Sequence, residues 1–66
     1  MLSKASVMNG LQSALPQAKL MWEGIVPGEA WITITTSEAE HYVAVCLSEP
    51  GLTAEQLVAN IVATLA

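Results

Sequence analysis

One histidine and one cysteine, His41 and Cys46, are the only conventional catalytic side chains in this sequence. A cysteine nucleophile and its histidine base have to lie within hydrogen-bond reach of each other. Both residues fall in an alternating, strand-like stretch, and their odd spacing places them on opposite faces of a strand. We expect His41 to face solvent at a strand edge and Cys46 to be a small hydrophobic residue in a packed face. The pair therefore predicts no nucleophilic site.

The carboxylates of Glu38 and Glu40 stand two residues apart and invite comparison with an acid–base pair. General acid–base catalysis needs a carboxylate whose pKa is shifted by its surroundings, whereas these two flank the well-hydrated tip of a predicted hairpin. The glycines are isolated and do not form a phosphate-binding loop. Trp22 and Trp31 could stack on a ligand, but packing in a core or an interface is the stronger expectation. We predict no enzymatic activity and no cofactor.

A single cysteine, a single histidine and the absence of aspartate leave one chain unable to form an intramolecular disulfide or a closed Cys/His metal site. An unpaired cysteine is typical of a reducing compartment, and the N-terminal residues lack the apolar block of a signal peptide. The longest purely apolar stretch, Val43–Leu47, is far shorter than the ~20 residues of a membrane-spanning helix. These features predict a cytoplasmic protein.

The charge balance argues against nucleic acid and membranes as partners. The net charge is −4, and Lys4 and Lys19 are the only basic residues besides His41. Binding to phosphates depends on Lys and Arg, and anionic lipid surfaces attract the same residues. We therefore expect protein partners.

The chain is rich in apolar residues for its size. Of its 66 residues, 53% are hydrophobic and 12% are charged, against about 25% charged in an average soluble protein. So short a chain buries only roughly 60% of its unfolded surface, and small domains commonly add a disulfide, a metal or a partner chain. With the first two excluded, we predict a homo-oligomer, most simply a dimer.

The N-terminal part is predicted to be helical. Ser3 can cap a helix over residues 3–15, whose apolar residues form one stripe, and Pro16 should kink or break it. A second short helix over residues 16–23 is the preferred interpretation, because proline suits a first helical position and good helix formers follow. A strand over Lys19–Trp22 is the alternative.

Two strands and a second helix follow. Pro27-Gly28 and Pro50-Gly51 are typical of type II turns. The segments 30–36 and 41–47 alternate as strands and are joined by four polar residues, which predicts an antiparallel hairpin. Thr53 and Gln56 form a capping box, and Leu52 with Leu57 forms a hydrophobic staple. The chain is thus expected to be one α+β domain over residues 1–66: an N-terminal helix, an antiparallel β-hairpin and a C-terminal helix.

The predicted hairpin has two unlike faces. A loop over residues 37–40 pairs Ile34 with Val43, Ile32 with Val45 and Ala30 with Leu47, and this face should carry the core beneath the C-terminal helix. The other face lacks charge and carries Trp31, Thr33, Thr35, Tyr42, Ala44 and Cys46. These six are the candidate interface, because Trp and Tyr are enriched in interfaces. The alternative is that the N-terminal helices cover this face within one chain.

The second half of the chain resembles a known family. Tyr42-Val43-Ala44, Pro50-Gly51 and Thr53 before the helix Glu55–Leu65 are similar to the corresponding stretch of HicB-family antitoxin domains, over about residues 31–65. The sequence lacks that family's third strand between the Pro-Gly turn and the helix cap, and begins about 28 residues before its first strand. The resemblance implies a protein that binds and neutralises a small toxin.

Together these features predict a small acidic, non-enzymatic interaction or regulatory protein, of the kind encoded by phages, mobile elements or accessory operons. Its expected partners are a second copy of itself and a larger protein target. A structural subunit that builds a symmetric assembly is the alternative function.

Overall fold

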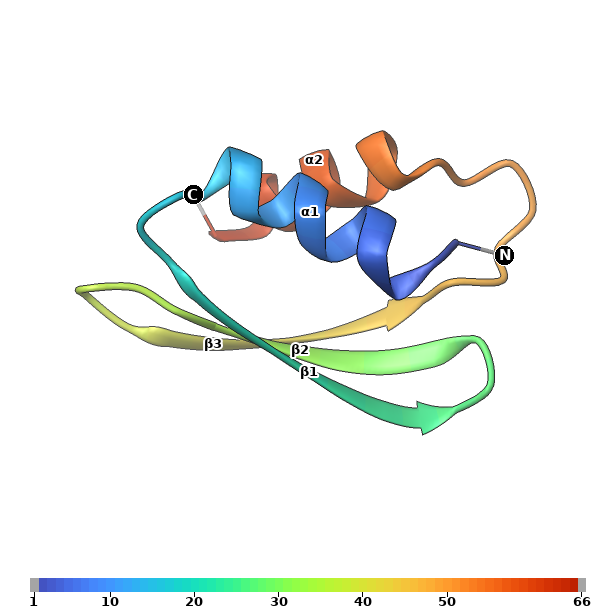
Figure 1. Ribbon diagram of the computed structural model, residues 1–66, viewed down its shortest axis with the longest axis horizontal. Coiled ribbons are helices and arrows are strands. Elements are labelled where there is room, and N and C mark those ends of the chain that lie inside the picture. The colour runs from blue at the N-terminus through green and yellow to red at the C-terminus, as the bar shows by residue number, and fades with distance from the viewer. Residues whose placement is uncertain (1, 66) are drawn as a thin grey trace.

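The computed structural model describes residues 2–65 and confirms the α+β class. The elements are α1 (Lys4–Ala14), β1 (Lys19–Val26), β2 (Glu29–Thr35), β3 (Glu40–Cys46) and α2 (Ala54–Leu65). The strands form one three-stranded antiparallel sheet in the order β1-β2-β3. Both helices lie on the same side of this sheet (Figure 1), so the molecule has two layers.

Helix α1 begins and ends where the sequence indicates. The Oγ of Ser3 accepts a hydrogen bond from the Ser6 N–H at 3.1 Å, which caps the first turn. The helix ends at Ala14, and the Leu15 N–H donates the final bond to the Leu11 carbonyl at 2.8 Å. The predicted break at Pro16 is therefore confirmed.

The predicted second helix over residues 16–23 is wrong, and the alternative of a strand over Lys19–Trp22 is confirmed, because strand β1 begins at Lys19. Leu20 and Trp22 are half-buried on the helix side of the sheet, whereas Lys19, Met21 and Glu23 are exposed. This alternation has the period of a strand. Pairing with β2 overrides the helical propensity of the individual residues, which is worth only a few tenths of a kcal/mol each. The sheet thus has one strand more than the predicted hairpin.

Both Pro-Gly turns form as predicted. Gly28 has φ 87° and Gly51 has φ 79°, the left-handed conformation that the third position of a type II turn requires. The Leu52 N–H donates to the Glu49 carbonyl at 3.3 Å and closes the second turn. The pairing of β1 with β2 is irregular between Gly24 and Val26, so a bulge precedes the first turn.

The register of the β2–β3 hairpin differs from the prediction by two residues. Ile34 faces His41, Ile32 faces Val43 and Ala30 faces Val45. The hydroxyl of Thr36 accepts hydrogen bonds from the N–H groups of Glu38 and Ala39 at 3.3 and 3.2 Å, so the loop begins at Thr36. Because the shift is an even number, every side chain stays on its predicted face.

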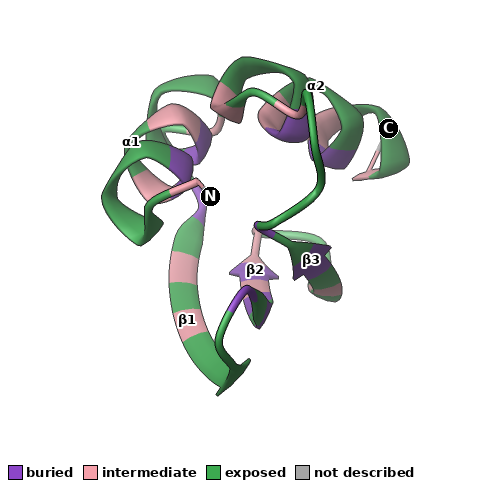
Figure 2. Ribbon diagram, turned by 90° about the vertical axis from the view of Figure 1, so that its right-hand side faces the viewer, coloured by how far each residue is buried: buried purple, intermediate pink, exposed green. Residues whose placement is uncertain are grey.

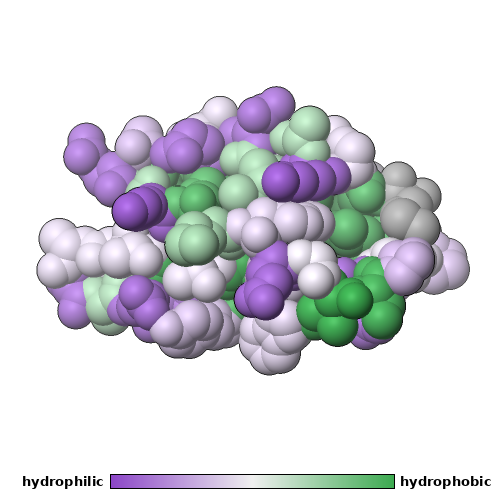
Figure 3. Space-filling model, turned by 60° about the horizontal axis from the view of Figure 1, so that its bottom comes forward, coloured by the Kyte–Doolittle hydropathy of each residue, from purple (hydrophilic) through white to green (hydrophobic). Residues whose placement is uncertain are grey.

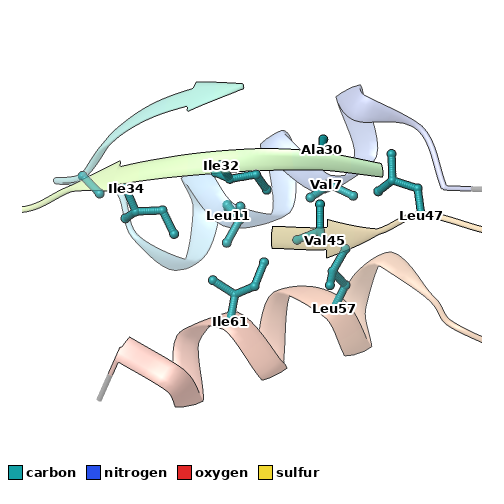
Figure 4. Packing of buried hydrophobic residues seen from close by; sticks show 10 residues of the cluster. Val7, Leu11, Ala30, Ile32, Ile34, Val45, Leu47, Leu57 and Ile61 are labelled. Atoms are coloured by element: carbon teal, nitrogen blue, oxygen red, sulfur yellow. The ribbon is translucent and has the colours of Figure 1, made fainter. Parts of the chain in front are cut away.

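The core lies between the helical layer and the sheet (Figure 4). Its fully buried centre consists of Ile32 and Ile34 from β2 with Val7 and Leu11 from α1. The buried residues around this centre include Ala30, Val45, Leu47, Leu57 and Ile61. The sequence predicted the strand residues, but it assigned only the C-terminal helix to this face, whereas α1 and α2 share it.

Helix α2 is capped at its start and packed against α1 along its side. The Gln56 N–H donates to the Thr53 Oγ1 and the Thr53 N–H donates to the Gln56 Oε1, both at 3.1 Å, which confirms the capping box. A Cβ added to Gly10 would lie 2.8 Å from the Cγ2 of Val58, so glycine permits the close approach of the two helices. The side of α2 that carries Val58 therefore packs against α1.

Candidate protein-binding face

The face of the sheet turned away from both helices is here called the outer face. The predicted candidates Trp31, Thr33, Thr35, Tyr42, Ala44 and Cys46 all lie on it, because the register places Trp31 opposite Ala44, Thr33 opposite Tyr42 and Glu29 opposite Cys46. Strand β1 adds Met21 opposite Thr33 and Glu23 opposite Trp31, and Lys19 stands opposite Thr35. The sheet thus brings together every predicted interface residue.

The N-terminal helix does not cover the outer face. Val7 and Leu11 of α1 are buried against the opposite face, together with Leu57 and Ile61 of α2. Figure 2 shows both helices above the sheet and its lower side uncovered. The alternative that the chain itself covers these residues is therefore wrong.

The outer face exposes large apolar and aromatic side chains. Tyr42 is 65% exposed, Met21 62% and Trp31 44%. Ile25 and Val26, at the bulge and turn that end β1, are also exposed, and Figure 3 shows strongly hydrophobic atoms gathered at one end of this side of the molecule. Exposed apolar groups that form a contiguous patch mark interaction sites more often than isolated ones do.

The expectation that this face lacks charge is wrong. Strand β1, which the sequence analysis gave only as the alternative to a helix, places Lys19 and Glu23 on it, and the ends of β2 and β3 add Glu29 and Glu40. Three carboxylates and one ammonium group therefore border an aromatic centre. Aromatic residues surrounded by a polar, charged rim are the usual anatomy of a protein–protein interface.

Tyr42 is tied to one of these carboxylates, because its hydroxyl donates a hydrogen bond to the Oε1 of Glu40. This hydrogen bond, together with the negative charge of Glu40, raises the pKa of the Tyr42 phenol above its ordinary value. The phenol is thereby held as a neutral hydrogen-bond donor on the exposed surface of β3.

The two conventional catalytic side chains are kept apart. His41 lies opposite Ile34 on the helix side of β3 and is half-buried, so its expected position facing solvent is wrong. Cys46 is on the outer face and exposed, with its Sγ 3.6 Å from the Ser48 Oγ, and so is not packed as expected. Their placement on opposite faces is confirmed. Glu38 and Glu40 are both exposed, as predicted for a hairpin tip.

Within residues 2–65, no three His, Cys, Asp or Glu side chains gather where they could hold a metal ion. A shallow apolar groove runs between the helices, lined mainly by small side chains such as Gly10, Ala14 and Ala59, together with Val58 and Val62. The residues that line this groove include no histidine or cysteine. The outer face is therefore the best-defined candidate site.

Comparisons with known proteins give no relative: no family model, no curated protein and no solved structure matches the chain. The resemblance to HicB antitoxin domains accordingly stays a prediction. Among the described helices, none combines the length and the apolar character needed to cross a membrane.

Proposed function

We propose that the chain is a non-enzymatic protein-binding domain that docks on its target through the outer face and acts as a homo-oligomer. The observation that carries the proposal is the uncovered sheet face, on which Trp31, Tyr42 and Met21 are exposed while both helices pack on the other side. A sheet with one solvated side ordinarily alternates apolar residues inside with plainly polar residues outside. This sheet departs from that pattern at its centre.

The charges at the rim indicate the chemistry of the target. Glu23, Glu29 and Glu40 border the aromatic centre, against the single Lys19. Two copies meeting face to face would bring like charges together, which is unfavourable in an interface. The face suits a different protein whose surface has an apolar centre bordered by Lys or Arg. The same carboxylates disfavour nucleic acid.

Site-specific photo-cross-linking in an extract of the native host tests the face directly. A photoreactive side chain at position 33, at the centre of the outer face, is expected to capture a defined protein. The matched control at position 17 is exposed and lies in the connection between α1 and β1.

Trp31→Glu supplies the second arm, because a carboxylate in the aromatic centre should abolish the adduct at position 33 while the far-ultraviolet circular dichroism stays that of the folded protein. An adduct that persists in Trp31→Glu, or that forms equally from position 17, would contradict a docking role for the outer face. Unfolding of Trp31→Glu would show instead that Trp31 belongs to the core.

A further inference from the structure

We propose that two copies of this chain join through the free edge of strand β1, in antiparallel register centred on Met21, to form one continuous six-stranded sheet. This inference deepens the proposed function and rests on its homo-oligomer part. It assigns that contact to a defined surface and leaves the outer face free for the target.

Strand β1 is an edge strand with unused backbone groups. The sheet order places β1 at one border, and it pairs on one side only, with β2. Within residues 2–65, no hydrogen bond joins residues 19–26 to any element other than β2. An uncovered edge presents a row of N–H and C=O groups that can pair with another strand.

The free edge of β1 is accessible. Figure 2 shows β1 descending away from the helical layer, so that much of its outer edge is turned away from α1 and α2. The bulge between Gly24 and Val26 lies at the far end of the strand. Residues 19–24 therefore remain regular, without proline, and long enough to pair.

Charge complementarity along β1 favours a second copy of the chain as the partner and sets the register of the pairing. Lys19 and Glu23 lie on the same face of β1, four residues apart, with Met21 midway between them. In an antiparallel pair centred on Met21, Lys19 of each copy stands opposite Glu23 of the other. The two-fold symmetry then produces two complementary pairs, and opposite charges directly across a strand pair are favourable whereas like charges are unfavourable.

The helix side of the same edge carries apolar residues. Leu20 and Trp22 are half-buried there, against the core cluster. The same register places Leu20 of one copy opposite Trp22 of the other, so both gain an apolar neighbour. Exposed ion pairs contribute only about 0–1 kcal/mol each, so backbone hydrogen bonds and this apolar contact supply the affinity while the charges set the register.

The other edge lacks this symmetry. Strand β3 carries Glu40 as its one carboxylate and has no lysine or arginine, so no antiparallel pairing of β3 with itself creates complementary charges of this kind. Pairing of β1 with β3 of another copy is head-to-tail, which produces rings or filaments rather than two-fold dimers. The contact through β1 is isologous and stops at two chains.

A charge-exchange experiment tests the contact by light scattering after size exclusion. The unmodified chain is expected at twice 7.0 kDa. Lys19→Glu and Glu23→Lys should each shift the mass to that of the monomer, because each places like charges opposite one another. Mixing the two single variants should restore the dimer, since the edge of one chain then carries two lysines that face two glutamates on the edge of the other. Lys4→Glu and Glu49→Lys carry the same charge changes at exposed positions outside the edge and should remain dimeric.

A cross-linking experiment tests the register, in a background with Cys46→Ser. Directly opposed residues in antiparallel strands have Cα atoms about 4.5–5.5 Å apart, within the range of a disulfide. Met21→Cys should therefore oxidise rapidly to a covalent dimer. Ile25→Cys, at a position that is also exposed, should not, because the two copies of residue 25 would lie roughly 26 Å apart at about 3.3 Å per residue.

The outcomes separate the two proposals. A monomer at every concentration overturns both the edge contact and the homo-oligomer. A dimer that survives Lys19→Glu and Glu23→Lys, or fails to cross-link at position 21, overturns the edge contact and leaves the homo-oligomer standing. Larger species that grow with concentration indicate pairing of β1 with β3 and also overturn it.

Discussion

At the scale of single residues, the outer face carries a hydrogen bond between Tyr42 and Glu40. The phenol donates to the carboxylate, and the hydrogen bond and the negative charge together raise the Tyr42 pKa. The neutral phenol is thereby favoured in the folded chain. The contribution of this contact to stability is fully present at pH values below the ordinary tyrosine pKa of about 10. It is lost as the pH rises through the raised pKa that Tyr42 has in the folded chain.

Titration of the tyrosinate absorbance measures this directly, because Tyr42 is the only tyrosine in the chain. We expect a midpoint above that of a free tyrosine side chain. Glu40→Gln should lower the midpoint, since the amide removes the negative charge. Glu38→Gln, in the same loop and exposed, is the control and should leave it unchanged. Identical midpoints in Glu40→Gln and the unmodified chain would show that the contact does not persist in solution.

At the scale of elements, local residue patterns determine α2 more firmly than any other segment. Pro50-Gly51, the capping box and the staple lie within a few residues of one another, so their effect does not depend on the rest of the fold. The cap and the buried apolar residues of α2, however, stabilise the fold by different amounts. The cap satisfies exposed N–H groups, whereas Leu57 is buried in the core cluster.

Two substitutions in α2 separate these contributions. Leu57→Ala should lower the free energy of unfolding by about 2–5 kcal/mol, the range for a buried leucine that leaves a cavity. Thr53→Ala should cost about 1 kcal/mol, because it removes only a cap. Chemical denaturation of both variants at one protein concentration checks the order. A larger cost at Thr53 would mean that α2 is held mainly by its cap rather than by the core.

Strand β1 shows where reasoning from the sequence stops. Gln17 through Met21 are good helix formers, and their strand conformation is imposed by pairing with β2, whose paired residues lie up to 16 positions away, as Lys19 does from Thr35. The alternation of Leu20 and Trp22 with Lys19 and Met21 was the available signal, but it spans too few residues to outweigh propensity. Because a helix was preferred over the alternative strand at Lys19–Trp22, the charges that β1 adds to the outer face were not expected.

The faces of the hairpin could be predicted even though its register could not. Which face a side chain occupies depends only on alternation along the strand, and that survives an even shift in register. The register itself depends on which residue closes the loop. In the structure the Thr36 hydroxyl closes the loop. The sequence alone does not show whether Thr36 or Ser37 takes this role.

At the scale of the whole molecule, the small size of the chain predicts that association contributes to its stability. The chain exposes 4341 Å², somewhat more than the roughly 4000 Å² that size scaling gives for a compact protein of this mass. Its dimensions of 33 × 21 × 18 Å are those of an elongated two-layer domain. A domain this small has few buried side chains with which to offset conformational entropy. Association should therefore contribute a measurable part of the stability.

Denaturation at different protein concentrations tests this coupling. If folded chains pair and unfolded chains do not, each tenfold rise in concentration stabilises the folded state by up to about 1.4 kcal/mol per dimer, by mass action. The denaturation midpoint, followed by the fluorescence of Trp22 and Trp31, should therefore move to higher denaturant as concentration rises. Lys19→Glu is the matched control, because a monomeric variant unfolds at one midpoint whatever its concentration. A midpoint independent of concentration in the unmodified chain would mean that the single two-layer domain carries its stability alone.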